Sequence, residues 1–223
     1  GKLNNTKEAQ LEQNLIDLLC AQHGQWTFRS DLKTEEDLWN NLRNIIEIRN
    51  KSELNDNMLT DSEFKRIRSE ILANTKTPFE AAKWLRGEKG KCSVVLERDN
   101  GLGRIELIIY SSIEKNGGFS SYEIVHQIAK NKSNLEERSR RFDITLLIGG
   151  LPIIQIELKT AIAKDGVKQA YYQIEKYIDE GTFSNTIFQT LQLYVMSNEQ
   201  TTRYMAAAPK GELQDKFMFG WRT

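Results

Sequence analysis

The segment RFDITLLIGGLPIIQIELK, residues 141–159, decides the fold that we expect for this chain. Two β-like runs, 142–148 and 152–158, stand on either side of the glycine pair Gly149–Gly150. Apolar, β-like runs that are joined through glycines are typical of a β-hairpin. We therefore predict a hairpin here and use its hydrophobic pattern to find its register.

The hydrophobic pattern of this hairpin favours a loop of three residues, 149–151. With this loop Ile148 lies opposite Pro152, and the same register brings Asp143 opposite Glu157. A loop of two residues would shift the pairing by one position and mix polar with apolar side chains on each face. The sorting of the side chains therefore predicts the three-residue loop and the pairing of the two carboxylates.

Side chains two residues apart in a strand share a face, so the predicted register sorts the hairpin into two faces. One face carries the polar side chains Asp143, Thr145, Gln155, Glu157 and Lys159, together with Leu147 and Ile153. The other face is apolar throughout: Phe142, Ile144, Leu146, Ile148, Pro152, Ile154, Ile156 and Leu158. Thr145 lies opposite Gln155 in this register. The apolar face predicts that both strands belong to the core of a sheet.

Asp143 and Glu157 form a candidate metal site at one end of the hairpin. Cross-strand neighbours lie about 5 Å apart at Cβ, and two carboxylates at that separation attract a cation. A hard oxygen site with few protein ligands suits Mg²⁺, and the backbone carbonyl of Leu158 is a further candidate ligand. Lys159 is placed to orient or help deprotonate an attacking water, so these residues predict phosphodiester hydrolysis. The alternative is a solvated hairpin face with a Glu–Lys pair, because the bare triplet is common by chance.

A helix expected over 166–181 follows the hairpin and presents three polar side chains on one stripe. Gln169, Gln173 and Tyr177 recur at spacings of four, which places them on the same side of an α-helix. They are candidates for supporting the site or contacting a substrate. The alternative is an ordinary solvated helix surface.

These residues resemble the PD-(D/E)xK nuclease superfamily, and in particular the N-terminal nuclease domain of the type I restriction enzyme R subunit. The Glu-x-Lys of 157–159 is followed by Gln-x-x-x-Tyr at 173–177, and the turn 148–152 is similar to the family's turn before the Glu. The segment 119–127 looks like a family strand that ends in Gln. Residues within 197–204 look like its downstream strands.

The resemblance covers about residues 110–205 most firmly and implies an α/β fold. The expected architecture is a restriction-endonuclease-like core with a mixed β-sheet flanked by helices, plus a helical N-terminal part. We expect the helical part to span 1–90 and the nuclease core to span 91–223, packed together as one structural domain. One departure is Phe142, where the family usually has Pro. That proline shapes the backbone and ligates nothing, so Asp143 keeps its expected role.

The resemblance also implies roles for the site residues and for partners. Asp143 and Glu157 would bind Mg²⁺, for which Mn²⁺ is able to substitute, and Lys159 would be catalytic. Gln173 and Tyr177 would support the site or touch double-stranded DNA, the implied substrate. The implied partners are the translocase part of the same subunit and the methyltransferase and specificity subunits. ATP would serve the translocase, because this chain has no Walker A motif and therefore no expected ATP site.

Two other functions stay open from the sequence. One is a docking module that binds DNA or partner subunits without cutting, which the zero net charge and the helical first third favour. The other is a repair nuclease or junction resolvase with the same core, which would cut DNA as a self-sufficient homodimer.

The first third of the chain reads as helical because apolar residues recur at helical spacings. We expect helices that begin at Thr6, Thr34 and Asp61, and a short one that starts near Pro78 and ends at Gly87. Strand-like segments are expected, besides the hairpin, at 26–30, 94–96, 104–110, 122–128, 191–196 and 203–208.

Four charged residues are weaker candidates. Arg138, Arg140 and Arg141 lie just before Asp143 and are able to hold phosphates, although a solvated loop explains them equally well. Glu12 lies on the first expected helix, from which related nucleases often place an acidic residue near the metal. Most glutamates on helix surfaces only add solubility, and this is the alternative for Glu12.

Composition sets the remaining limits. The chain has 223 residues with 31 basic and 31 acidic side chains, and this zero net charge argues against tight autonomous DNA binding. Cys20 and Cys92 form no CxxC pair and, without a signal peptide, predict free thiols in the cytoplasm. No apolar run approaches the roughly 20 residues of a membrane helix, so no membrane partner is expected. His23 and His126 lack partners at metal-ligand spacing and are expected to be structural.

Overall fold

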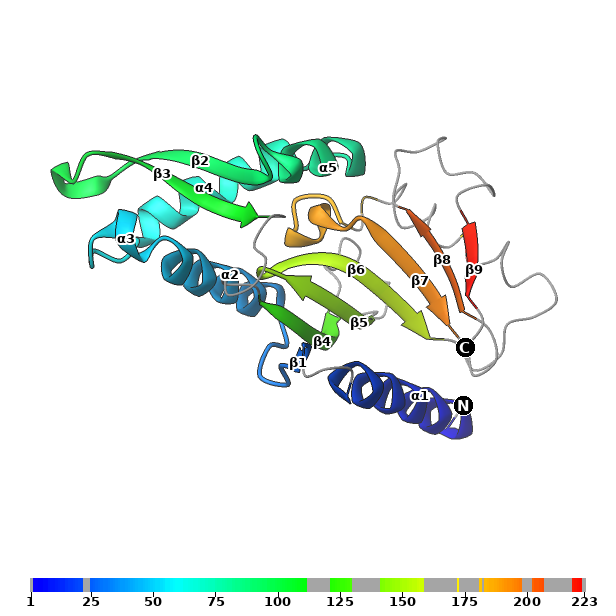
Figure 1. The fold of residues 1–223 in the computed structure, drawn as a ribbon. Helices are drawn as coiled ribbons and strands as arrows, with labels where there is room; N and C mark the ends of the chain where they lie inside the picture. The colour runs from blue at the N-terminus through cyan, green and yellow to red at the C-terminus, as the bar shows by residue number, and fades with distance from the viewer. Residues whose placement is uncertain are drawn as a thin grey trace.

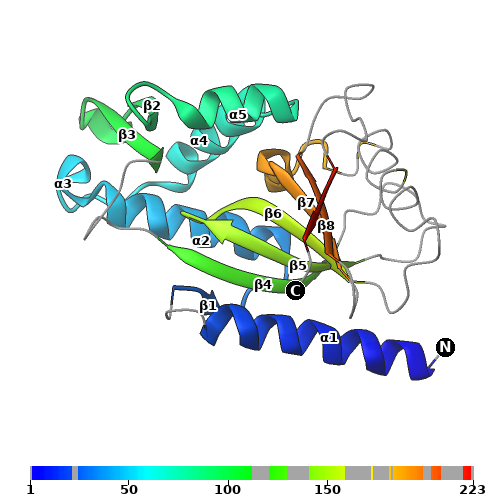
Figure 2. The same cartoon turned by 45° about the vertical axis from the view of Figure 1, so that its right-hand side comes forward.

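The computed structural model describes these residues: 2–21, 25–111, 121–129, 141–158, 172, 181, 183–197, 202–206 and 218–221. A seven-stranded mixed sheet forms the centre of the molecule (Figure 1). Helix α1 (Lys2–Ala21) runs along one face of this sheet, and helices α2–α5 lie on the other side (Figure 2). Both faces of the strands at the centre of the sheet are therefore covered by other elements.

Sequence signals at both ends explain the helices α2 (Glu35–Arg49), α4 (Asp61–Asn74) and α5 (Pro78–Arg86). Thr34 and Thr60 each accept a hydrogen bond from the third residue of their helix, and the acidic side chain there bonds back to form a capping box. Thr77 caps α5, whose proline occupies the first turn. Short α3 (Lys51–Leu54) was not expected. The predicted starts of α2, α4 and α5 are confirmed.

The predicted start of the first helix is wrong. Thr6 was expected to cap it, but α1 already begins at Lys2 and Thr6 lies inside the helix. Residues 2–5 contain neither glycine nor proline, so nothing in them stops the helix from extending toward the N-terminus.

The large sheet has the strand order β1-β4-β5-β6-β7-β8-β9. Its strands are β1 (Thr27–Phe28), β4 (Tyr122–Ala129), β5 (Arg141–Ile148), β6 (Leu151–Leu158), β7 (Leu193–Ser197), β8 (Thr202–Ala206) and β9 (Met218–Trp221). The pairs β1–β4 and β6–β7 are parallel, and the other pairs are antiparallel. Neither β9 nor the 3₁₀ helix η2 (Ile187–Thr190) was expected from the sequence.

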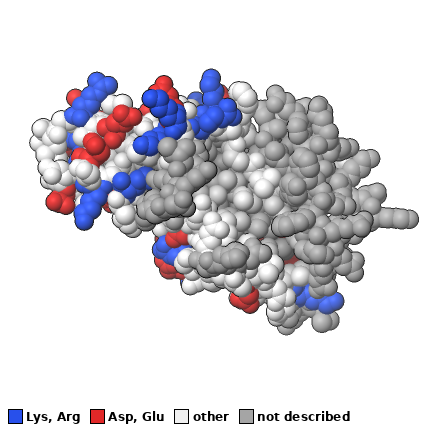
Figure 3. All heavy atoms as spheres, viewed as in Figure 1, with Lys and Arg blue, Asp and Glu red and all other residues white. Residues whose placement is uncertain are grey.

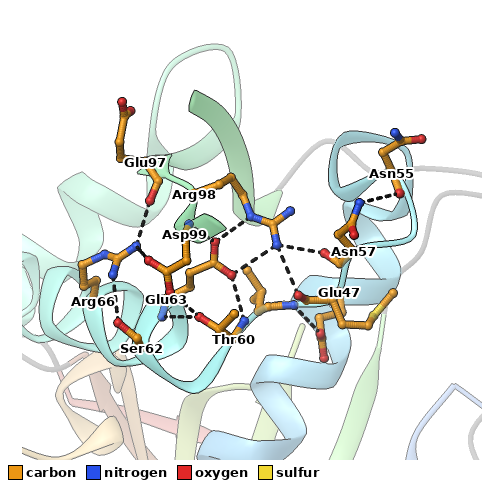
Figure 4. A network of polar contacts seen from close by, with 12 residues as sticks. Glu47, Asn55, Asn57, Thr60, Ser62, Glu63, Arg66, Glu97, Arg98 and Asp99 are labelled. Atoms are coloured by element: carbon orange, nitrogen blue, oxygen red, sulfur yellow. Dashed lines mark hydrogen bonds and ion pairs between the residues drawn. The ribbon is translucent and has the colours of Figure 1, made fainter. Parts of the chain in front are cut away.

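Strands β2 (Lys91–Glu97) and β3 (Arg104–Ser111) do not join this sheet. They form a separate antiparallel pair that packs on α4 and α5, with the expected turn at 99–101. Figure 4 shows how the turn is fixed to α4. The buried Arg98 donates from Nε to Glu63 Oε2 at 2.7 Å, and Glu63 also accepts the backbone N–H of Asp99. A buried, hydrogen-bonded ion pair therefore holds this small sheet on the helices.

Charged side chains gather over the part built from α3–α5 and the β2–β3 pair, on the face of the molecule seen in Figure 3. Lysine, arginine, aspartate and glutamate are intermixed there. The described surface over the large sheet carries few charges in the same view. The intermixing agrees with the zero formal net charge of the whole chain.

The hairpin β5–β6 is confirmed, but its predicted three-residue loop is wrong. Ile148 pairs with Leu151, so the turn consists of Gly149 and Gly150 alone. Both glycines have positive φ, 60° and 81°, as a two-residue turn of this type requires. A bulge then inserts Ile153 as an extra residue, because Leu146 pairs with Ile154 while Leu147 pairs with Pro152. The bulge restores the predicted register toward the site.

Two apolar clusters occupy the two faces of the large sheet. Ile16 of α1 packs with one set from the sheet: Ile124, Ile144, Leu146, Ile156 and Leu158. Helices α2, α4 and α5 cover the other set, which includes Val125, Ile128, Phe142, Leu147, Leu151 and Met196. Phe142 was expected to share a face with Ile144, and this is wrong. Its ring instead lies 4.5 Å from that of Phe188 on the opposite face.

A mixed sheet enclosed by helices, with a helical first third, confirms the expected α/β class. It is consistent with the restriction-endonuclease-like core implied by the resemblance. Cys20 and Cys92 are free thiols, as predicted. Among the helices in the described part of the chain, none combines the length and apolar character that a membrane span requires.

Candidate active site

The predicted site residues divide into those that the structure describes and those that it does not. Asp143 lies on β5, and Glu157 and Leu158 end β6. Arg141 begins β5, where only its backbone is described. Six further candidates lie outside the described residues: Arg138, Arg140, Lys159, Gln169, Gln173 and Tyr177. The same holds for the helix expected over 166–181, apart from Gly181 in a turn and the exposed, helical Tyr172.

Asp143 reaches across to the end of the neighbouring strand. Its Oδ2 accepts a hydrogen bond from the backbone N–H of Leu158 at 2.8 Å. The paired part of β5 and β6 ends at Ile144 and Ile156, so Asp143 and Glu157 are the next residues on the two strands. The Asp143 carboxylate therefore lies between β5 and β6, beside the peptide that follows Glu157.

The Glu157 side chain is contacted by Gln155 of the same strand. Its side chain is buried, with the residue only 6% exposed, and its Oε1 lies 3.4 Å from the Nε2 of Gln155. Gln155 in turn accepts a 2.6 Å hydrogen bond from the hydroxyl of Thr145, and these two residues pair across β5 and β6 as predicted. A buried polar row therefore leads to the Glu157 carboxylate. On the other side of β6, Glu157 pairs with Met196 of β7.

Glu12 of α1 contacts β4 rather than the β5–β6 pair. Its Oε1 lies 2.5 Å from Nδ1 of His126, and its Oε2 accepts from Nε2 of Gln127 at 2.7 Å. The placement of Glu12 near the metal site stays a prediction. Sequence reasoning did not predict His126 and Gln127 as its partners, since the connections around β4 are too long to reveal which strand it joins.

The donor set at the end of the hairpin fits a hard divalent cation. Two carboxylates on adjacent strands supply oxygen ligands, and Mg²⁺ favours few protein ligands because it keeps several waters. A strand residue directs its N–H and C=O to the same edge of the strand. Because the N–H of Leu158 points to Asp143, its carbonyl is expected on the Asp143 side of β6 as well. In the part of the chain that the structure describes, no three His, Cys, Asp or Glu side chains gather as a metal-binding group. The described donors are thus two carboxylates and a backbone oxygen.

A sequence profile described as type I restriction enzyme R protein N terminus matches residues 5–212. The type I restriction enzyme SsaAORF53P endonuclease subunit of Staphylococcus saprophyticus is 31% identical over 192 residues, which are 85% of this chain and 18% of that protein. The SauCOLORF180P endonuclease subunit of Staphylococcus aureus strain COL is 29% identical over 195 residues, which are 86% of this chain and 19% of that protein.

A third relative is the type I restriction enzyme EcoprrI endonuclease subunit of Escherichia coli. It is 38% identical over 99 residues, which are 43% of this chain and 30% of that protein. The chain thus spans about a fifth of the length of the two staphylococcal relatives. The profile covers nearly the whole chain, from the first helix to the strands beyond the hairpin. This chain therefore belongs to the family of type I restriction enzyme R protein N termini.

Proposed function

We propose that this chain is a Mg²⁺-dependent endonuclease domain that hydrolyses phosphodiester bonds of double-stranded DNA within a type I restriction–modification complex. The observation that supports it best is the hydrogen bond from Leu158 N–H to Asp143. This bond fixes the Asp143 carboxylate beside the end of β6, the strand that carries Glu157 and directly precedes Lys159 in the sequence. The names of the relatives support the same class of enzyme.

Each member of the set has a distinct proposed task. Asp143 and Glu157, with the Leu158 carbonyl, are the proposed ligands, and a Mg²⁺ held there would polarise the scissile phosphate. Lys159 is the proposed catalytic residue that orients the attacking water and helps to remove its proton. The water oxygen bonds to phosphorus while the bond from phosphorus to the leaving sugar oxygen breaks.

The residues around the set are proposed to hold it and its substrate. Gln155 and Thr145 restrict the Glu157 carboxylate, because a buried polar row limits its rotation. Gln169, Gln173 and Tyr177 are proposed to support the site or touch DNA, and Arg141 to contact phosphate. The proposed partners are the ATP-driven translocase part of the same subunit and the methyltransferase and specificity subunits.

Replacing Lys159 by alanine in the assembled restriction enzyme tests the proposal. We expect DNA cleavage to fall by about 100-fold or more, since a positioned acid–base group contributes roughly that factor. ATP hydrolysis is the internal control and should be unchanged, because it belongs to another part of the subunit. Cleavage at the wild-type rate would contradict the proposal and favour a docking module that does not cut.

A further inference from the structure

Gln127 has a backbone conformation that strands do not normally contain. Its φ is +53°, and among the described residues it is the one non-glycine with positive φ inside a strand. The others lie in turns and loops, and four of those five are Asn or Asp. A left-handed glutamine within β4 is strained, and such strain persists only where surrounding contacts enforce it.

The faces of the sheet are exchanged at this residue. On β4, the ring of His126 packs edge-on against Phe28 on the α1 side, 4.9 Å between centroids, whereas Ile128 lies in the opposite core. Residues two apart in a regular strand share a face, and these two do not. On β5, Ile144 and Phe142 show the same exchange. Both strands therefore turn over at the same position along the sheet, which means that their side chains change from one face to the other there.

Gln127 and Asp143 are the residues at the position where the two strands turn over. His126 pairs with Ile144, and Ile128 pairs with Phe142, so the residue between each pair is Gln127 on β4 and Asp143 on β5. Asp143 thus lies at the point where β5 changes faces. Its carboxylate reaches the Leu158 N–H in the gap toward β6.

Glu12 of α1 contacts the side chain of Gln127. The partly buried side chain of Glu12, 13% exposed, accepts from the Gln127 amide at 2.7 Å and contacts His126 through its second carboxylate oxygen. The two partners are adjacent residues that would point to opposite faces of a regular strand, yet both reach one carboxylate on α1. Glu12 can therefore contact both side chains only because β4 turns over at Gln127.

We propose that Glu12 and Gln127 are positioning residues for Asp143: the Glu12–Gln127 contact holds β4 and β5 turned over, which keeps the Asp143 carboxylate beside Leu158. This inference rests on the proposed function, since it assigns what holds a metal ligand in place. It gives the acidic residue of α1 a task through hydrogen bonding, not through metal coordination.

The test measures Mn²⁺ affinity of the 223-residue chain by calorimetry, with thermal unfolding as a second readout. E12A and Q127A should each weaken binding by about tenfold, the usual effect of losing a residue that orients a ligand. The double variant E12A/Q127A should be no weaker than E12A, because both changes break one contact. Additive losses in the double variant would overturn the proposal.

Two conservative variants separate positioning from other roles. E12Q keeps an acceptor for Gln127 and a donor for Nδ1 of His126, so it should retain Mn²⁺ affinity, whereas loss in E12Q would make Glu12 a ligand. Q127G loses the amide but fits positive φ, so it should melt about 2–4 °C above Q127A while binding Mn²⁺ equally weakly. A merely structural role predicts that affinity follows stability, and that result would also overturn the proposal.

Two further variants serve as controls. Asp17 lies on the same helix, is exposed, and bonds only to Gln13 among the described contacts, so D17A should leave Mn²⁺ affinity unchanged. D143A should abolish binding. If D143A binds normally, the proposed function fails; if D143A fails to bind while E12A and Q127A bind normally, only the present inference fails.

Discussion

Asp143 Oδ2 accepts the backbone N–H of Leu158 at 2.8 Å, in the position where a strand partner's carbonyl would otherwise act. One carboxylate oxygen therefore replaces a link of the sheet ladder at the end of the β5–β6 pair. The arrangement gives Asp143 a structural and a proposed chemical task at once. The two tasks can be separated by changing its charge without changing its shape.

We expect D143N to separate them. Asparagine can still accept from Leu158, and it removes the repulsion between two neighbouring carboxylates, so the unfolding free energy should stay within about 1 kcal/mol of wild type. Mn²⁺ binding should be lost, because the charged ligand is gone. Urea unfolding and calorimetry measure the two effects. A variant that binds Mn²⁺ as wild type does would show that this carboxylate is not a ligand.

A second prediction concerns Gln155, whose amide connects Thr145 to Glu157. Q155M keeps a similar volume but removes the polar row, so the Glu157 carboxylate should lose its fixed orientation. We expect Mn²⁺ affinity to fall by about tenfold, with cleavage falling in parallel. Q192M is the matched control, because among the described contacts the side chain of Gln192 bonds only to backbone carbonyls, those of Pro78, Thr190 and Leu191. Unchanged affinity in Q155M would contradict this role.

The β5–β6 hairpin shows which structural features its sequence predicts and which it does not. The apolar alternation predicted the pairing of Thr145 with Gln155 correctly, because only that register buries the apolar residues. The loop length was wrong because alternation cannot distinguish a three-residue loop from a two-residue turn followed by a bulge at Ile153. Both solutions give the same faces at the site.

The rest of the site depends on contacts between distant segments, which local patterns do not encode. Phe142 was assigned to the wrong face because alternation assumes a regular strand, and β5 changes faces between Ile144 and Phe142. The contact from Glu12 to Gln127 spans 115 residues. Residue spacing reveals neither which face each β4 side chain occupies nor which strand lies beside β4. Glu12 was therefore predicted as an acidic residue near the site, but its partners were not.

A third prediction concerns the turn itself. A Cβ at Gly150 would lie 3.0 Å from Cδ1 of Ile45 and 3.2 Å from Cα of Leu42, and φ is +81°. We expect G150A to lower the unfolding free energy by about 2–3 kcal/mol, since strain and close packing against α2 both oppose it. G149A should cost less, because its nearest neighbour is the movable end of Arg49. Urea unfolding that ranks the two variants in the opposite order would refute this argument.

The last prediction concerns pH and the Glu63–Arg98 pair. Burial raises the pKa of Glu63, but hydrogen bonds from Arg98 and from the backbone N–H groups of Thr60 and Asp99 outweigh it and lower the pKa from 4.5 to about 2. A lowered pKa means that the folded state binds this proton less readily than the unfolded state. The pair therefore stabilises the fold above pH 4.5, on the order of 3 kcal/mol, and this contribution is lost as the pH falls toward 2.

The double variant E63Q/R98M isolates this contribution. Glutamine still accepts the N–H of Thr60, and methionine removes the buried charge that a single substitution would leave unpaired. Unfolding free energies measured between pH 5 and pH 2 should fall less steeply in the double variant than in wild type. E36Q is the control, because Glu36 pairs with Arg68 at the surface and should leave the slope almost unchanged. Equal slopes in wild type and E63Q/R98M would mean that Glu63 titrates alike in the folded and unfolded chains, contrary to the buried ion pair.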